Sequence, residues 1–350
     1  FLRAFKAGYF AILYNFIVMG WVINAMASVV SVMLDMDKWT AVWLCVIIAL
    51  VYAILSGFWG VVVTDLVQFF IAMFGSIALA IIALNYVGGM DSLLYKLSGL
   101  LGSDAIHNNT LKFIPPIPKE SIGTLTFWES PFSKFLIFIT VMWWSHHGTD
   151  GGGYIIQRMS SAKNERHALL ATLWFNLAHY ALRVWPWIIV AVVSIVMFPI
   201  IPEAYSELGV KAGYPLVMNA LLGPGMKGIL IVSFLAAFMS TIDTHLNWGA
   251  SYLVNDLYKR FYRPNESETH YVLVGKILTV VLMILAAFTA MKMQSISKAW
   301  EFIFSMGAGI GLVLILRWFW WRINAWSEIT ALGTSILVTI ILEILAYNQT

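Results

Sequence analysis

The stretch Ile229-Leu-Ile-Val-Ser-Phe-Leu-Ala-Ala-Phe-Met-Ser240-Thr241-Ile-Asp243-Thr244 decides what kind of fold this chain adopts. Its first part is apolar enough to lie in a membrane, and its end carries three hydroxyls and a carboxylate within five residues. In a helix, the spacing i, i+3, i+4, i+7 puts four residues on one face: Ala237, Ser240, Thr241 and Thr244. A polar stripe at membrane depth, bordered by Asp243, is unfavourable unless something compensates it. A dehydrated alkali cation, which needs oxygen ligands, is one such partner.

The composition of the chain is that of an integral membrane protein. Of its 350 residues, 60% are hydrophobic and only 11% are charged, whereas about a quarter of the residues in soluble domains are charged. The 16 tryptophans are typical of helices anchored at the headgroup level. The single cysteine, Cys45, lies in an apolar span and predicts no disulfide. A net charge of +3 is too small to indicate a nucleic-acid partner.

Hydropathy predicts nine membrane spans, because a helix needs about 20 apolar residues to cross a bilayer. They cover residues 8–34, 39–56, 58–87, 133–158, 166–199, 224–260, 271–291, 299–321 and 325–347. Residues 88–132 form a long loop, and residues 200–223 form a second loop with a short helix around 214–222. Arginines gather at alternate span ends, around residues 3, 158–166, 260–263 and 317–322, which assigns those ends to the cytoplasm and the loop 88–132 to the extracellular or periplasmic side.

The fourth span is predicted to be discontinuous. After Trp144 come polar residues and the three consecutive glycines 151–153, which cannot continue a stable helix. Unwound backbone at membrane depth is tolerated only where it lines a cavity or is buried in protein, and broken helices build the substrate sites of secondary transporters. The alternative is an ordinary loop between two spans, but the apolar run 135–144 is too short to cross alone.

Three stretches carry a resemblance to the sodium/solute symporter family, which includes sodium-coupled sugar, proline and sialic acid transporters. The first runs from Tyr52 to Phe70 and includes Thr64-Asp65-Leu-Val-Gln68, and the second is Tyr154-Ile-Ile-Gln157-Arg158 with Ser160-Ser-Ala-Lys163. The third is Ala236-Ala-Phe-Met-Ser240-Thr241, continuing to Asp256-Leu-Tyr258-Lys259. Their order and spacing match the family over nearly the whole chain.

The resemblance implies an all-α membrane protein with the LeuT-type fold, a five-plus-five inverted repeat. The first eight spans resemble core helices three to ten, and the ninth is an extra helix. Core helices one and two are missing, so the single transporter domain, residues 1–350, is expected to be incomplete at its N-terminus. Phe1 in place of Met also indicates a trimmed start. In the family, the first core helix completes one sodium site and part of the substrate site.

The resemblance also implies cation sites. The main sodium site falls on the Ala237 carbonyl and the Ser240 and Thr241 hydroxyls; the alternative is that both hydroxyls bond back to their own helix. A second sodium, bound by some members, matches Asp65 with Ser240, Asp243 and Thr244. Two close carboxylates can also favour a proton in place of the ion. The alternative is that Asp65 lines the ion exit path or caps a helix.

Candidate substrate residues come from three spans. The broken fourth span supplies Ser145, Gly148, Thr149 and Asp150 by resemblance, and the stacking aromatic of sugar-transporting relatives is absent at 148 and 149. The fifth supplies Asn176, His179 and Arg183, and the eighth supplies Glu301. Arg183 can hold a substrate carboxylate by a bidentate pair, or can pair with Asp150 or Glu301.

The sequence therefore predicts a sodium-coupled symporter of a small polar solute, foremost a sugar or sugar derivative, working by alternating access with one or two Na⁺. Organic anions and amino acids are the alternative solutes. A passive channel and a membrane metalloenzyme using residues 146, 147, 150 and 179 are alternatives of other classes. The expected setting is a cell membrane, foremost a bacterial inner membrane, where the chain crosses the lipid bilayer several times. We expect no enzyme activity, nucleic acid or obligate protein partner.

Overall fold

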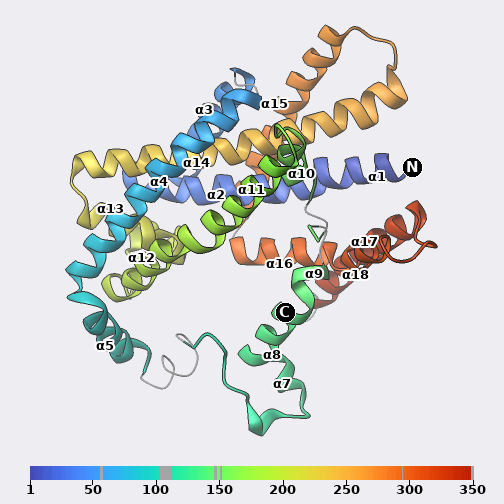
Figure 1. Cartoon of the computed structure of the whole chain (residues 1–350). Helices are drawn as coiled ribbons and strands as arrows, with labels where there is room; N and C mark the ends of the chain where they lie inside the picture. Colours follow the sequence, from blue (N-terminus) through green and yellow to red (C-terminus); the bar gives the residue numbers. More distant parts are fainter. Residues whose placement is uncertain (56–57, 103–111, 146–147, 150–151, 294, 348–350) are drawn as a thin grey trace. The chain divides into compact units, whose positions relative to one another are not determined.

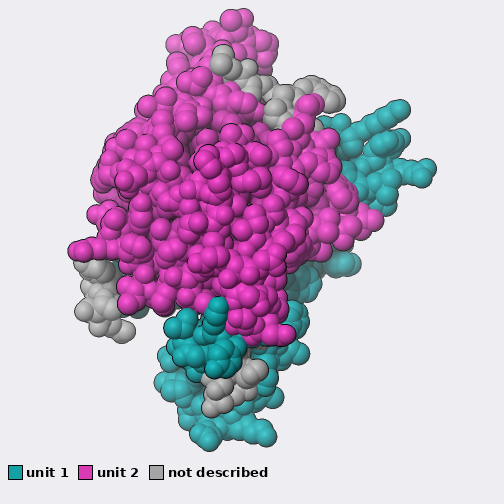
Figure 2. Space-filling model, turned by 90° about the vertical axis from the view of Figure 1, so that its left-hand side faces the viewer, with its two compact units in different colours: residues 1–2, 94–172, 300–350 teal, residues 3–93, 173–299 magenta. Residues whose placement is uncertain are grey.

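The computed structural model describes residues 1–350 except 56–57, 103–111, 146–147, 150–151, 294 and 348–350. The described residues are helical, with no β-strand among them. By contacts, the chain divides into two compact units, which Figure 2 shows in different colours. Unit 1 comprises residues 1–2, 94–172 and 300–350, and unit 2 comprises residues 3–93 and 173–299.

Unit 2 holds the longest helices. Its elements are α1 (Leu2–Gly8), η1 (Tyr9–Tyr14), α2 (Asn15–Leu34), α3 (Lys38–Leu55), α4 (Phe58–Tyr86), the start of α5 (Gly89–Leu101), the end of α11 (Glu165–Asn176), η5 (Leu177–Leu182), α12 (Val184–Met197), η6 (Glu203–Ala212), α13 (Gly213–Leu221), α14 (Pro224–Ser251), η7 (Tyr252–Tyr262), α15 (Glu268–Lys292) and the start of α16 (Ile296–Gly307). In Figure 1, α14 lies against α2 and α4.

Small residues bring the helices of unit 2 close together. A β-carbon at Gly20 of α2 would lie 2.8 Å from the Thr289 methyl of α15, and α15 presents Ala286 and Ala290 to the same core. Lipid tails are as apolar as side chains, so close backbone packing, rather than the hydrophobic effect, holds membrane helices together. The resulting core joins α2, α3, α14 and α15.

A second packing contact fixes α4 on α14. A β-carbon at Gly75 of α4 would lie 2.5 Å from Leu230 of α14. Val87, just beyond the end of α4, shares a core cluster with Met226 in the first turn of α14. The two helices therefore pack antiparallel, with Gly75 and Leu230 at the same level.

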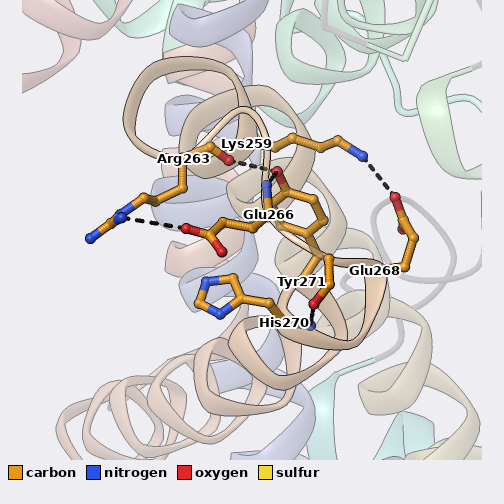
Figure 3. Close-up of polar contacts among 7 residues, drawn as sticks. Lys259, Arg263, Glu266, Glu268, His270 and Tyr271 are labelled. Atoms are coloured by element: carbon orange, nitrogen blue, oxygen red, sulfur yellow. Dashed lines mark hydrogen bonds and ion pairs between the residues drawn. The ribbon is translucent and has the colours of Figure 1, made fainter.

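The turn between η7 and α15 is held by polar contacts, drawn in Figure 3. Tyr271, which is 5% exposed, donates its hydroxyl to the Arg263 carbonyl over 2.6 Å and accepts the Glu266 N–H over 3.1 Å. Lys259 pairs with Glu268 at 3.1 Å, and Arg263 with Glu266 at 3.4 Å. The ion pairs are exposed and contribute little, so the buried tyrosine is the main restraint on this turn.

Unit 1 holds the shorter helices. Its elements are the end of α5, η3 (Lys119–Ser121), α7 (Leu125–Glu129), α8 (Pro131–Ile137), η4 (Phe138–Met142), α9 (Trp143–Ser145), α10 (Gly152–Ser160), the start of α11, the rest of α16, α17 (Ile310–Leu316) and α18 (Ala325–Tyr347). The segment 88–132, expected as a loop, contains α5, η3 and α7. The short helix expected around 214–222 is α13.

Six described helices are long and apolar enough to cross a membrane, or seven if α16 and α17, bent by 44°, count as one broken span. Two of the nine predicted spans fall outside this set. Residues 39–56 correspond to α3, whose apolar part is shorter than the others. Residues 133–158 correspond to the run α8–η4–α9, which ends at Ser145, and to α10, which begins at Gly152. The predicted break in the fourth span is confirmed by the turn at Gly148 and Thr149, but Gly152 and Gly153, predicted to lie in the break, begin α10 instead.

Candidate functional site

The residues expected to bind the main sodium lie in the middle of α14. The Thr241 hydroxyl donates a hydrogen bond to the Ala237 carbonyl over 3.0 Å, which is the back-bonding alternative raised by the sequence. Ala237 is exposed in unit 2, and Ser240 and Thr241 are half-buried. Back-bonding uses the Thr241 hydroxyl proton and a lone pair of the Ala237 carbonyl, and it leaves the Thr241 oxygen with lone pairs that can face a cation.

Asp243 is fully buried on the side of α14 that borders this stripe. Its Oδ1 accepts a hydrogen bond from Asn247 Nδ2, one turn further along, over 3.0 Å. A buried carboxylate needs a compensating charge or hydrogen bonds, and the Asn247 amide supplies one such hydrogen bond. Asn247, which the sequence did not single out, therefore orients this carboxylate.

Asp65 lies on α4, ten residues before Gly75, where α4 meets Leu230 of α14. Ten residues separate Asp65 from Gly75, and ten separate Ser240 from Leu230, the two positions where these antiparallel helices meet. At 1.5 Å per residue both offsets are about 15 Å along the helix pair. The residues expected to share a second sodium, Asp65, Ser240, Asp243 and Thr244, thus lie on two helices that pack together in unit 2.

The broken fourth span lies in unit 1, where it contacts α17. Thr149 donates its hydroxyl to the Trp144 carbonyl, which folds the chain back after α9. A β-carbon at Gly311 would lie 2.0 Å from that carbonyl and 2.4 Å from the Ser145 carbonyl carbon, so only glycine fits there. Ser145 is 8% exposed and Gly148 half-buried, while Asp150 lies outside the described residues.

The candidate residues of the fifth span surround a π-helix, η5. Arg183 Nη2 lies 3.4 Å from His179 Nε2, and the guanidinium lies 5.0 Å from the centre of the Trp187 ring. Because arginine only donates, His179 accepts through Nε2 in this pair. Trp187 in turn donates to the Ser76 hydroxyl of α4 over 3.1 Å. Asn176 is exposed. Glu301 is exposed near the start of α16 and accepts the Ser305 hydroxyl at its backbone carbonyl.

The main residue that the sequence analysis missed is Asn15. It is fully buried at the start of α2, donates to the His245 carbonyl over 2.8 Å and accepts from His245 Nδ1 over 2.7 Å. His245 lies one turn beyond Thr241 on α14, so this pair fixes α2 beside the cation residues. A β-carbon at Gly249 would lie 2.3 Å from Asn15 Nδ2. The sequence feature that could have identified this residue is an asparagine inside an apolar span.

Within the described residues, no three or more His, Cys, Asp or Glu side chains gather as metal ligands. The metalloenzyme alternative would use His179 together with residues 146, 147 and 150 as metal ligands. Of these, residues 146, 147 and 150 lie outside the described part of the chain.

Comparison with known proteins identifies the family of this chain. Residues 6–333 match the profile of the Sodium:solute symporter family. The chain belongs to this family. Its members are membrane symporters rather than enzymes, so this chain is a multi-pass membrane protein of a sodium-coupled transporter family.

Curated relatives are distant in sequence but similar over most of the chain. The osmoregulated proline transporter OpuE of Bacillus subtilis is 24% identical over 85% of this chain and 55% of its own length. A sodium/glucose cotransporter of Vibrio parahaemolyticus is 24% identical over 86% of this chain and 56% of its own. The chain spans about half the length of the curated relatives it matches.

A solved structure shows the same fold. The substrate-bound outward-open state of a Na⁺-coupled sialic acid symporter superposes with a TM-score of 0.61 at 15% identity, covering 98% of this chain and 75% of that one. The fold is therefore of the LeuT type, as the sequence predicts.

Proposed function

We propose that the protein couples the inward movement of Na⁺ to the uptake of a small polar solute, foremost a sugar or sugar derivative, by alternating access. The observation that supports this most is the stripe on α14, where Ser240 and Thr241 adjoin the fully buried Asp243. A carboxylate and hydroxyls inside a spanning helix are stabilised by a bound cation, and the flow of that cation down its gradient supplies the driving force.

The main sodium is proposed to contact the Ala237 carbonyl and the Ser240 and Thr241 hydroxyls. A second ion is proposed at Asp65, Asp243 and Thr244. The packing of α4 on α14 supports this grouping, because it brings together the two helices that carry these carboxylates.

The solute is proposed to bind at the break of the fourth span, where Ser145, Gly148, Thr149 and Asp150 offer side chains and freed backbone groups. Asn176, His179 and Glu301 are proposed as further polar contacts. Sugar cotransporters and proline transporters are about equally similar to the chain. The guanidinium of Arg183, which lies beside His179 and Trp187, supports an organic anion or amino acid as the second candidate solute.

The two compact units are proposed to belong to one transporter domain, because the family match runs through both from residue 6 to 333. Residues 88–132 are proposed to lie on the extracellular or periplasmic side of a cell membrane, foremost a bacterial inner membrane, and the cytoplasmic side carries the basic span ends.

Uptake by the full-length protein in proteoliposomes tests the proposal. Sugars, sugar acids and amino acids are screened with an inward Na⁺ gradient or with choline in its place. At least one solute is expected to accumulate only with Na⁺, and accumulation that persists with choline would remove sodium coupling. Asp65→Asn and Asp243→Asn are expected to lower the Hill coefficient for Na⁺; an unchanged coefficient in both variants would remove the second ion.

A further inference from the structure

Unit 1 contains a pocket that the proposed transport site does not use. It has a volume of about 810 Å³ and lies between the bent pair α16–α17 and helix α18. Pockets of about 300–1,000 Å³ are the usual size of small-molecule sites. The six hydroxyls that line it are Ser305, Ser327, Thr330, Thr334, Ser335 and Thr339.

The pocket follows from the shape of two helices. On α18 its lining residues recur at i, i+3, i+4, i+7 and i+8 from Ser327, so they form one face of the helix. The bend of 44° between α16 and α17 falls at Gly309, where a β-carbon would lie 2.8 Å from the Ala331 carbonyl. The helices therefore touch at that glycine, which itself lines the pocket.

The hydrogen bonds already made inside the pocket decide what it can recognise. Ser335 donates to the Ser305 carbonyl over 3.2 Å, Ser305 to the Glu301 carbonyl over 2.8 Å, and Thr330 to the Trp326 carbonyl over 2.7 Å. Their protons are used, and Ser335 Oγ also accepts the Gly309 N–H over 2.9 Å, so the remaining lone pairs are those of Ser305 and Thr330 and one of Ser335. These positions therefore offer acceptors, which favours a ligand that donates hydrogen bonds.

Thr339 points to the same conclusion. Its side chain lines the pocket although the residue is only 5% exposed, and it makes no hydrogen bond to any residue in the described part of the chain. The hydroxyl is not among the buried side-chain atoms of the described residues that lack a partner, so it is accessible from the pocket. A ligand hydroxyl in the pocket would supply the missing partner.

The rest of the lining sets the charge and the shape of the ligand. None of the described lining residues is charged, so an ion would leave its charge uncompensated at membrane depth. Next to Thr339 the pocket is lined by Val338 and Leu342 of α18. Val313 lines it from α17. The lining thus combines hydrogen-bond acceptors at one end with apolar side chains at the other.

We propose that this pocket binds a neutral amphiphile with a polyhydroxylated head group, such as a glycosylated lipid, with the head at Thr330, Ser335 and Thr339 and the alkyl chain along Val338 and Leu342. Gly311, two residues beyond the bend, contacts the end of α9. A ligand in the pocket would therefore change the contact between α17 and the broken fourth span. This inference does not depend on which solute the protein carries.

The test uses the full-length protein in phosphatidylcholine nanodiscs and an octyl glucoside with a photoreactive diazirine in its alkyl chain. After illumination, adducts are mapped by peptide mass spectrometry. We expect adducts within residues 305–342, competed by octyl glucoside and not by octyl phosphocholine, which has the same tail and no hydroxylated head. Competition by free glucose at the same concentration would identify a free sugar, rather than a lipid, as the source of the polyol.

Two variants with a matched control complete the test. Thr339→Val is expected to weaken labelling about fivefold, the change produced by one lost hydrogen bond, and Thr334→Phe to abolish it by filling the space. Thr279→Val removes a hydroxyl of similar burial on α15, which bonds the Gly275 carbonyl, and is expected to leave labelling unchanged. Equal competition by octyl phosphocholine, or unchanged labelling in both pocket variants, would overturn the proposal.

Discussion

Replacing Thr241 by valine removes one proposed sodium ligand while keeping the shape of the side chain. The hydroxyl is half-buried and its hydrogen bond, to the Ala237 carbonyl at 3.0 Å, lies within α14. Loss of such a bond changes the free energy of unfolding by about 0.5–1.5 kcal/mol, so the variant should fold. An interaction with a charged partner contributes about 1.5–3 kcal/mol, which predicts a sodium affinity about 10- to 150-fold weaker.

The assay is the Na⁺ concentration giving half-maximal solute uptake in proteoliposomes, together with the melting temperature of the purified protein. Thr289→Val is the matched control, because Thr289 donates to the Leu285 carbonyl one turn back over the same 3.0 Å, on α15. The half-maximal Na⁺ concentration should rise in Thr241→Val and stay constant in Thr289→Val. A folded Thr241→Val protein with unchanged sodium dependence would refute the assignment of the main site.

Three further outcomes are expected. Gly249→Ala should destabilise unit 2 by about 1–3 kcal/mol, because the new methyl meets Asn15 Nδ2 at 2.3 Å; adding Asn15→Ala should recover part of the loss in the melting temperature. Gly311→Ala should abolish uptake, since its methyl would lie 2.0 Å from the Trp144 carbonyl; wild-type uptake would contradict the packing. The pKa of Asp37 lies below its usual value of 3.8, mainly because the Thr40 hydroxyl donates a hydrogen bond to its carboxylate. Asp37 therefore stabilises the start of α3 at any pH above its unfolded pKa. This stabilisation is lost as the pH falls through the folded pKa. Asp37→Asn keeps an acceptor without the titration, so its melting temperature should fall less in acid than that of the wild type; parallel curves would exclude this linkage.

Features set by local composition were predictable from the sequence. The excess of apolar residues predicted a helical membrane protein, and the polar run after Trp144 predicted the interruption seen at Gly148 and Thr149, whereas Gly152 and Gly153, expected in the break, begin α10. The segment 88–132 shows the limit of that reasoning, because its turn-forming residues hid helix α5. Its 13 residues are too few and too polar for a span, so hydropathy did not register it.

What the sequence by itself determined is the kind of protein and the face of α14 that offers oxygens, since helical periodicity alone aligns Ala237, Ser240 and Thr241. What only the tertiary structure decided is which groups meet that face. Gly75 of α4 rests on Leu230 of α14, and the Asn15–His245 pair joins residues 230 positions apart. Such contacts arise from the packing of separate helices, which no local pattern records.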